Sequence, residues 1–427
     1  MGKAQLYIIS SLNTIRQNNL LRTPISYFNS SNEVTGFDRW VVTRLLARIG
    51  DPPISFVLWN NKKIASPGVL PRAQIRITCR YALYKLLLNP ELNFGDLYSN
   101  GYIDIDGDMA DCLRIIYHTL GKLKKYSFLS LIDRYFCHPN TLPKVRQNIH
   151  HHYDIGNDFY QHWLDREAMQ YTCAYFPDPA MSLEAAQTAK MHHICRKLRL
   201  KPGQTVVEAG CGWGGLARFM AKEYGVKVKA YNISQEQISY AHQCAVKSGL
   251  TQQVEYIEDD FRNIRGDYDA FVSIGMLEHV GPENYYALGG VIDRSLKEHG
   301  LGLIHTIGRN QPRPLNAWIG KRIFPGAYPP SLSQMMRVFE PWSFSILDIE
   351  NLRLHYAKTL EIWHTRFENN ADKFRSHYDE PFIRAWRLYL VGSMVAFHTG
   401  TMQLFQVLFT KQHNNVLDWS RAYLYQD

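Results

Sequence analysis

The chain has 427 residues, more than one ordinary domain, and its 48 Lys and Arg against 39 Asp and Glu give a formal charge of +9. This charge favours an anionic partner surface, and without an arginine-rich tract or a zinc-finger or RNA-recognition signature we expect phospholipid headgroups rather than nucleic acid. Seven cysteines without a Cys-x-x-Cys pair exclude a disulfide framework and an obvious zinc site, and the broken apolar core of residues 1–12 predicts no secretory signal. We therefore expect a protein of the reducing cytosol.

The first predicted element is a helix near residues 37–48 in which apolar and basic residues alternate at helical spacing. Its apolar members are Phe37, Trp40, Val41 and Leu45, and its basic members are Arg39, Arg44 and Arg48. The pattern is typical of a basic amphipathic helix that lies on a membrane, and also of an ordinary surface helix with solvated arginines. Strands are predicted at 54–59 and 73–78, followed by an apolar helix at 81–88.

A basic connector with proline breakers predicts a domain boundary near residues 120–145. We expect a smaller α+β domain over residues 1–125, a linker over 126–148 and a second domain over 149–427. Before this boundary, Asp104, Asp106 and Asp108 suggest a calcium-binding EF-hand loop. The glycine of such a loop belongs at its sixth position, but here it is Gly107, and Ile115 occupies the place of the bidentate glutamate, so we reject this interpretation.

The stretch from Val206 to Leu216, VVEAGCGWGGL, predicts a buried strand, a glycine turn and then a helix, so a nucleotide-like ligand should lie on this turn. The third glycine of the dinucleotide fingerprint and a Gly-Lys-Ser/Thr phosphate loop are both missing, which leaves S-adenosylmethionine as the leading candidate. A tight strand-to-helix connection without a ligand is the alternative.

Further strands are predicted at 226–231, 268–274 and 301–304, with helical segments between them. Strands that alternate with helices indicate an α/β fold with a doubly wound parallel sheet, which binds ligands at the carboxyl ends of its strands. Residues that follow these strands are therefore the candidates for chemistry.

The run from Leu388 to Phe409 has no Asp, Glu, Lys or Arg and is long enough to cross a bilayer. Its polar residues are Ser393, His398, Thr399, Thr401, Gln403 and Gln406, in addition to Gly400. These polar groups would be costly against lipid, so a buried core helix is favoured over a membrane span.

Several motifs carry a family resemblance. They are His152–Tyr160 (HYDIGNDFY), Met169–Phe176 (MQYTCAYF), Asn232–Gln237 (NISQEQ), Ser273–Pro282 (SIGMLEHVGP) and His305–Gly308 (HTIG). In these motifs the sequence resembles the cyclopropane-fatty-acyl-phospholipid synthases, and more broadly the mycolic acid methyltransferases, from about His150 to the C-terminus. The resemblance implies a class I, Rossmann-like S-adenosylmethionine-dependent methyltransferase domain, preceded by an N-terminal lipid-binding domain.

The implied reaction places a methyl group on a carbon–carbon double bond and leaves a carbocation, which loses a proton to close a cyclopropane ring. In the family the base is a bound bicarbonate ion, and the matching positions are Cys173, Glu278, His305, Ile307 and Tyr356. Hydrogen-bond donors among them suit a small anion, while Glu278 could orient His305 or share a proton with the ion. Aromatic faces could hold the cations, and of these we expect Tyr171 and Trp213 beside the cofactor and the others mainly in the core.

Each position also has another interpretation. Cys173 could be a buried structural thiol, or a hydrolytic nucleophile paired with His305, although no hydrolase motif surrounds it. Glu278 could cap a helix. Three adjacent histidines, His150 to His152, cannot readily converge on one ion, so we expect no metal site.

The resemblance also implies a set of cofactor-binding residues. Tyr171 and Thr172 would lie near the methionine end, above the turn formed by Gly210, Cys211, Gly212, Trp213 and Gly214, with Gln237 at the ribose and Asp260 and Phe261 at the adenine. Asn232 stands where many methyltransferases have an acidic residue and close relatives often have threonine, which weakens the expected ribose contact at this position.

The resulting hypothesis is an enzyme at the inner face of the membrane that cyclopropanates unsaturated phospholipid acyl chains. We expect a homodimer, as family members often form. Methyl branching without ring closure, amine N-methylation and a catalytically inert lipid-binding protein are the alternatives. Cys173, His305 and Tyr356 argue against an amine acceptor, which has no need for them.

Overall fold

The computed structural model describes residues 33–122 and 156–424. They form two compact units: residues 33–122 with Tyr378–Leu388, and residues 156–377 with residues 389–424. The division expected from the sequence did not include Tyr378–Leu388 in the first unit. Residues 1–12, the predicted linker 126–148 and His150–His152 lie outside the described residues.

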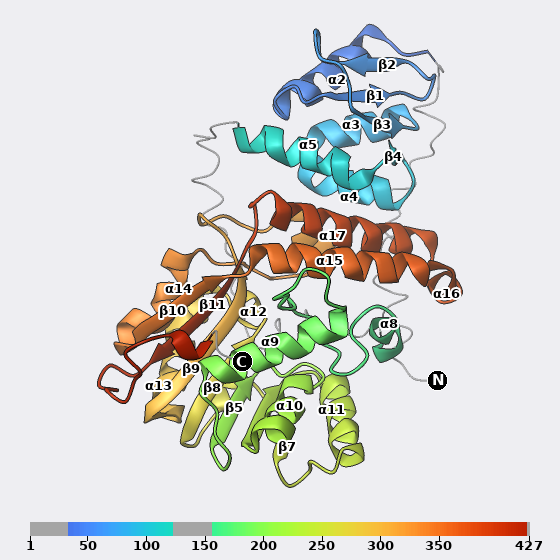
Figure 1. The fold of residues 1–427 in the computed structure, drawn as a ribbon. Helices are drawn as coiled ribbons and strands as arrows, with labels where there is room; N and C mark the ends of the chain where they lie inside the picture. Colours follow the sequence, from blue (N-terminus) through green and yellow to red (C-terminus); the bar gives the residue numbers. More distant parts are fainter. Residues whose placement is uncertain (1–32, 123–155, 425–427) are drawn as a thin grey trace. The chain divides into compact units, whose positions relative to one another are not determined.

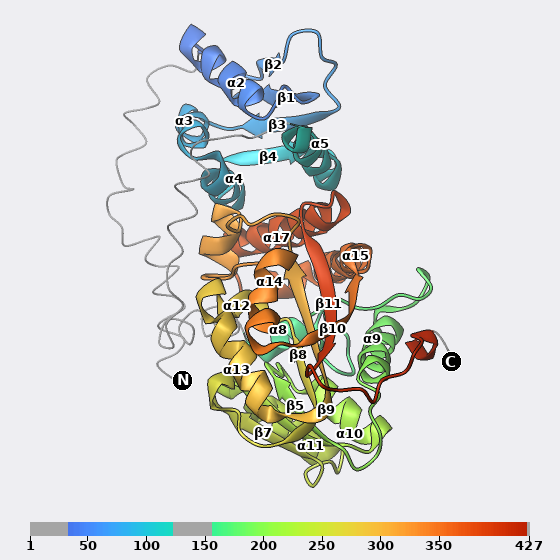
Figure 2. The same ribbon diagram turned by 90° about the vertical axis from the view of Figure 1, so that its left-hand side faces the viewer.

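The first unit is a four-stranded sheet of order β2-β1-β3-β4, covered by helices (Figures 1 and 2). Its elements are α2 (Gly36–Arg48), β1 (Ile54–Val57), β2 (Lys63–Ala65), β3 (Ala73–Ile77), α3 (Arg80–Leu88), α4 (Pro90–Ser99), β4 (Ile103–Asp106) and α5 (Met109–Lys122). β1 pairs parallel with β3, and the two outer pairings are antiparallel. The strands predicted at 54–59 and 73–78 and the helices predicted at 37–48 and 81–88 are confirmed to within a few residues.

Helix α2 begins at a capping box, in which Thr35 and Asp38 bond each other's backbone N–H groups. One face of α2 buries Val41, Val42, Leu45 and Leu46 in the core of this unit. Arg384 from the segment Tyr378–Leu388 donates to the carbonyl oxygens of Tyr98 and Ile103, at 2.7 and 3.0 Å.

The second unit contains a seven-stranded sheet of order β10-β11-β9-β8-β5-β6-β7. Its strands are β5 (Thr205–Ala209), β6 (Lys227–Asn232), β7 (Val254–Glu258), β8 (Tyr268–Ile274), β9 (Leu296–Gly308), β10 (Ser345–Asn351) and β11 (Gln403–Thr410). The five strands from β7 to β9 pair parallel, whereas β11 pairs antiparallel with both β9 and β10. The predicted α/β fold is confirmed.

Helices cover both faces of this sheet (Figures 1 and 2). The helices of the second unit are α8 (Asn157–Gln161), α9 (Leu183–Lys197), α10 (Gly215–Tyr224), α11 (Gln235–Lys247), α12 (Leu277–Val280), α13 (Tyr285–Ser295), α14 (Leu332–Phe339), α15 (Arg353–Asn369), α16 (Ala371–Arg375) and α17 (Glu380–His398), whose residues up to Leu388 belong to the first unit. Its short helices are η2 (Phe261–Asn263), η3 (Pro282–Asn284), η4 (Ile319–Ile323), η5 (Glu340–Trp342) and η6 (Ala422–Leu424). Neighbouring residues of one strand enter different cores: Val206 packs with α9 and α10, and Val207 packs with α13 and α14. This alternation explains why the central strands are apolar throughout.

The prediction of one buried helix from Leu388 to Phe409 was wrong. Helix α17 ends at His398, Gly400 turns the chain at φ 75°, and β11 follows as a fully buried strand between β9 and β10. The polar residues that the sequence concentrates after His398 interrupt the helix, and the β-branched and aromatic residues beyond them suit a central strand. Across the two described ranges, no helix combines the length and apolar character needed to span a bilayer.

Candidate active site

The glycine turn follows β5 directly and has a left-handed backbone. Gly210, Gly212 and Gly214 have φ values of 83°, 52° and 73°, a region that favours glycine. The backbone N–H groups of Gly210 and Cys211 both donate to Tyr231 O, at 2.9 and 3.0 Å, which ties the turn to the end of β6. Gly214 is the N-cap of α10, and its carbonyl accepts a 2.8 Å hydrogen bond from the Tyr256 hydroxyl.

A pocket with about 1070 Å³ of empty space, including its open mouth, lies on this turn. Ten of the eleven residues predicted to bind the cofactor line it: Tyr171, Thr172, Gly210, Cys211, Gly212, Trp213, Asn232, Gln237, Asp260 and Phe261. Gly214 is not among the lining residues and instead starts the helix. Because these residues follow β5, β6 and β7 or precede α9, the pocket occupies the carboxyl edge of the sheet, as doubly wound folds predict.

Further lining residues were not predicted as binding residues. They are Met169, Gln170, Glu208, Tyr231, Ile233, Asp259, Arg262, Ile274, Gly275, Met276, His279 and Val280. Most flank strand ends, and the predicted strand at 268–274 was the signal that could have located Gly275 and Met276.

Aromatic rings form one wall of the pocket. The Tyr160 ring lies 5.0 Å from the Trp213 ring and 5.4 Å from the Tyr171 ring, measured between centroids. Trp213 Nε1 donates to Asn157 at 2.7 Å, and the hydroxyls of Tyr171 and Tyr389 lie 2.8 Å apart. These contacts fix both rings, so their faces are ordered before a ligand binds.

The amide of Asn232 is engaged within the protein. Its Nδ2 donates to Gly212 O at 3.2 Å and to Gln237 Oε1 at 2.8 Å, while its Oδ1 accepts from Ile233 N at 2.8 Å. Asn232 therefore connects the glycine turn to Gln237, in addition to lining the pocket.

Two buried charges lie below the predicted methionine end. Lys190 Nζ donates to Gln170 Oε1 at 2.6 Å and to Thr172 Oγ1 at 2.9 Å, and burial lowers the pKa of Lys190 to about 8. Glu208 at the end of β5 has one buried oxygen, Oε2, without a protein partner, and burial raises the pKa of Glu208 to about 7. A ligand that brings a hydrogen-bond donor would satisfy this oxygen.

Glu278 and Ile307, which the sequence analysis assigned to the anion site, are in direct contact. Glu278 Oε1 accepts a 2.6 Å hydrogen bond from Ile307 N, whereas Glu278 Oε2 is buried without a partner. Burial raises the pKa of Glu278 to about 7. Glu278 thus connects α12 to the end of β9.

His305 lies two residues before Ile307 on β9, so both side chains are on the same face of the strand. His305 Nδ1 lies 3.1 Å from Gln406 Nε2, and His305 Nε2 is buried without a partner. Gln406 of β11 is therefore the residue that orients the ring. Glu278, which the sequence suggested for this role, accepts from Ile307 N instead. His305 O accepts a 2.8 Å hydrogen bond from Gly275 N, and Gly275 lines the cofactor pocket.

Tyr356 belongs to the first turn of α15, and Cys173, from the segment before α9, lies beside the start of this helix. Cys173 Sγ contacts Ala174 O at 3.1 Å and Leu352 O at 3.9 Å, and Tyr356 packs its ring 4.6 Å from Phe397. Burial raises the pKa of the Cys173 thiol far above its ordinary value, which argues against a thiolate nucleophile. None of the five predicted catalytic residues lines the cofactor pocket itself, although Thr172, Gly275 and His279 beside them do.

Tyr285, the first residue of α13, is fully buried in the core that α13 and α14 form. Among residues 33–122 and 156–424, no cluster of three His, Cys, Asp or Glu side chains could hold a metal ion.

A class I strand order and a pocket on the glycine turn define an S-adenosylmethionine-dependent methyltransferase. The chain belongs to the family described as mycolic acid cyclopropane synthetase, whose model matches residues 141–407.

Three relatives illustrate the extent of the similarity. The chain is 42% identical to the cyclopropane-fatty-acyl-phospholipid synthase of Escherichia coli K12, over 90% of this chain and 97% of that protein. It is 34% identical to a probable fatty acid methyltransferase of Pseudomonas putida, over 88% of this chain and 96% of that protein. Among solved structures, the mycolic acid cyclopropane synthase CmaA1 complexed with SAH and CTAB is 30% identical, with a TM-score of 0.59 over 62% of this chain and 98% of that one.

Proposed function

We propose that this enzyme transfers a methylene group from S-adenosylmethionine to the cis double bond of unsaturated phospholipid acyl chains, with bicarbonate as the base. The observation that carries the proposal is one edge of the sheet, where the pocket on the glycine turn is lined by His279, next to Glu278, and by Gly275, whose N–H donates to His305 O. Glu278 and His305 each have a buried polar atom without a partner. The two relatives from Escherichia coli and Pseudomonas putida are named as a cyclopropane-fatty-acyl-phospholipid synthase and a probable fatty acid methyltransferase, and both names fit this proposal.

The pocket suits S-adenosylmethionine on its own geometry. Glu208 Oε2 offers a buried acceptor for a donor of the methionine moiety, Asp260 and Gln237 offer polar atoms further along, and the Tyr171 and Trp213 faces suit a sulfonium. S-adenosylmethionine supplies an electrophilic methyl group. The protein's own task is to hold the acyl chain against it and to exclude nucleophiles that would trap a cation.

The second task is removal of a proton from the methylated chain. His305 Nε2 and the carboxyl of Glu278 both offer buried hydrogen-bonding atoms that a small anion would satisfy. The backbone N–H of Ile307 holds the Glu278 carboxyl at the end of β9, the strand that also carries His305. A carboxyl with a raised pKa exchanges a proton near neutral pH, which suits transfer to and from bicarbonate. Cys173 and Tyr356 would complete the surroundings of the ion.

We further propose that the first unit docks on anionic phospholipid at the inner face of the membrane through α2. Phe37 and Trp40 stack at 5.5 Å and are 58% and 48% exposed, and the Arg44 guanidinium lies 5.3 Å from the Trp40 ring. Aromatic rings beside arginines are typical of membrane interfaces, where each basic residue contributes about 1 kcal/mol. The double variant Trp40→Ala, Arg44→Ala should sediment less with phosphatidylglycerol vesicles than the unmodified enzyme does. Val246→Ala is the control and should sediment like the unmodified enzyme, because Val246 is an exposed apolar residue of α11, away from α2 in the sequence.

The central experiment incubates the enzyme with labelled S-adenosylmethionine and vesicles of unsaturated phospholipid, with and without bicarbonate. A mass gain of one methylene, new ring protons and loss of alkene protons would support cyclopropanation. Methyl branching would appear as a methyl signal without ring protons, and a methylated amine would refute modification of the acyl chain. We also propose that the enzyme is a homodimer, as the family resemblance implies, and sedimentation equilibrium tests this.

A further inference from the structure

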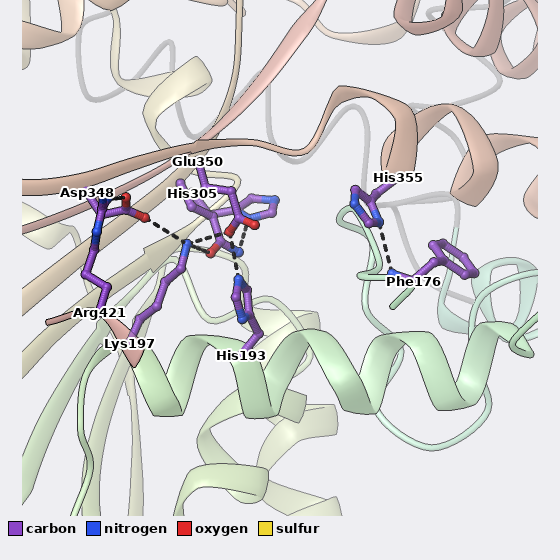
Figure 3. Close-up of polar contacts among 9 residues, drawn as sticks. Phe176, His193, Lys197, His305, Asp348, Glu350, His355 and Arg421 are labelled. Carbon is purple, nitrogen blue, oxygen red and sulfur yellow. Dashed lines mark hydrogen bonds and ion pairs between the residues drawn. The ribbon is translucent and has the colours of Figure 1, made fainter. Parts of the chain in front are cut away.

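We propose that Lys197 and Gln406 are positioning residues that hold His305 in the tautomer with its proton on Nε2, so that an N–H is directed at the anion. The inference rests on the proposed bicarbonate chemistry and adds to it a chain of hydrogen bonds from α9 through β11 to β9. Figure 3 shows Lys197, His193 and Glu350 gathered beside His305.

Lys197 determines which way the Gln406 amide faces. Lys197 is 1% exposed, and its Nζ donates to Gln406 Oε1 at 2.8 Å and to Glu350 Oε2 at 2.6 Å. An ammonium group only donates, so the oxygen of the amide must face Lys197 and the NH₂ must face the other way.

The NH₂ of Gln406 in turn determines the tautomer of His305. Gln406 Nε2 lies 3.1 Å from His305 Nδ1, and an amide nitrogen cannot accept a hydrogen bond. His305 Nδ1 must therefore accept and carry no proton, which leaves the single proton of a neutral ring on Nε2. This buried Nε2 is the atom without a protein partner.

The ring stays neutral because burial, with Lys190 and Lys197 nearby, holds the pKa of His305 well below its ordinary value. Glu350 compensates the charge of Lys197: although burial opposes it, hydrogen bonds from His193 and Lys197 hold the pKa of Glu350 at about 2. His193 itself stacks on Tyr175 at a centroid distance of 4.3 Å, so the motif that contains Cys173 abuts this network.

A buried lysine is costly, and an ion pair between α9 and β10 could serve stability alone. The two roles make different predictions for the ring of His305. An ion pair that serves stability alone places no requirement on which ring nitrogen of His305 carries the proton. The proposed chain of hydrogen bonds holds this proton on Nε2.

The test is ¹⁵N NMR of histidine-labelled full-length enzyme, with the His305 ring signals assigned by their loss in His305→Asn. We expect Nδ1 without a proton and Nε2 with one at pH 7. In Gln406→Glu a carboxylate beside Lys197 can only accept, so Nδ1 should become protonated. Lys197→Met frees the amide to rotate and should give a mixture of tautomers.

A second readout is the bicarbonate concentration that gives half-maximal turnover. It should rise about tenfold or more in Gln406→Glu and Lys197→Met, the effect of losing one hydrogen bond to a charged group, with an unchanged KM for S-adenosylmethionine. Gln403→Glu is the matched control, because Gln403 is buried on the same strand and bonds Gly400 O and Asn351 instead. It should change neither the tautomer nor the bicarbonate dependence.

A proton on Nδ1 in the unmodified enzyme would overturn the inference, as would a tautomer change in Gln406→Glu without any change in bicarbonate dependence. Turnover that never depends on bicarbonate, with Nε2 protonated as expected, would refute the bicarbonate part of the proposed function and leave the tautomer assignment standing.

Discussion

The carboxylate of Glu278 accepts a 2.6 Å hydrogen bond from the backbone N–H of Ile307, which joins α12 to the C-terminal end of β9. One oxygen of Glu278 is thereby fixed by the backbone, and the other remains buried without a partner. A carboxylate held in this way is positioned rather than mobile, which is what transfer of a proton to a small ion requires.

Glu278→Gln should lower product formation about 100-fold, because an amide cannot exchange a proton with the ion. The hydrogen bond from Ile307 N can persist to the amide oxygen, so the fold should be retained. Product analysis by mass spectrometry and calorimetric binding of S-adenosylmethionine would separate these effects, with binding expected to stay within about twofold. Glu283→Gln on η3 is the control; equal losses in both variants would contradict the assignment.

His305→Ala should also reduce turnover about 100-fold, since it removes the buried Nε2 atom that lacks a protein partner. His299→Ala is the matched control, because His299 is an exposed residue of the same strand. Initial rates at saturating S-adenosylmethionine give the comparison. Turnover by His305→Ala at the rate of the control would remove His305 from the site.

Gly214→Ala should destabilise the enzyme by about 3 kcal/mol, from the left-handed backbone and from displacement of a neighbouring ring. A Cβ at Gly214 would lie 2.5 Å from the Tyr256 ring, whereas a Cβ at Gly212 would meet nothing within 4 Å. Gly212→Ala should therefore cost only about 1 kcal/mol, the backbone contribution. Urea unfolding at constant pH measures both, and a similar loss in both would refute the role of Tyr256.

Glu208→Gln should change the pH dependence of stability. Burial raises the pKa of Glu208 from 4.5 to about 7, so its favourable contribution is complete below pH 4.5 and is lost as the pH rises through 7. Relative to the unmodified enzyme, Glu208→Gln should gain on the order of 3 kcal/mol between pH 4.5 and pH 8. Urea unfolding across this range tests the difference, with Glu255→Gln on the exposed side of β7 as the control. A difference that stays constant with pH would contradict a buried carboxyl.

Asp38→Ala should destabilise the first unit by about 3 kcal/mol, because it leaves the Arg80 guanidinium without its buried partner and removes one of the two hydrogen bonds of the capping box of α2. Although burial opposes it, hydrogen bonds from Arg80, Thr35 and Tyr84 lower the pKa of Asp38, so this contribution should fade as the pH falls through the native pKa. Thermal unfolding at pH 7 and at low pH provides the measurement. Asp111→Ala, which breaks an exposed pair with Arg114, should have little effect.

The sequence by itself determined the class of fold and the location of the cofactor pocket, because both depend on local patterns. Apolar strands that alternate with helices specify a doubly wound sheet, and glycines with positive φ specify the turn after β5. Eight of the ten predicted cofactor residues that line the pocket lie within a few residues of the ends of β5, β6 or β7, and parallel strands end at one edge. The other two, Tyr171 and Thr172, precede α9 and were expected there from the family resemblance alone.

Only the tertiary structure decided how residues distant in sequence are paired. The apolar run after Leu388 could not be divided into α17 and β11 from composition, because pairing with β9 and β10 stabilises the strand. That pairing brings Gln406 to His305, 101 positions earlier, and Lys197 of α9 to Gln406. Such contacts follow from the order of strands in the sheet and from buried polar groups that must find partners, and no periodicity along the chain encodes them.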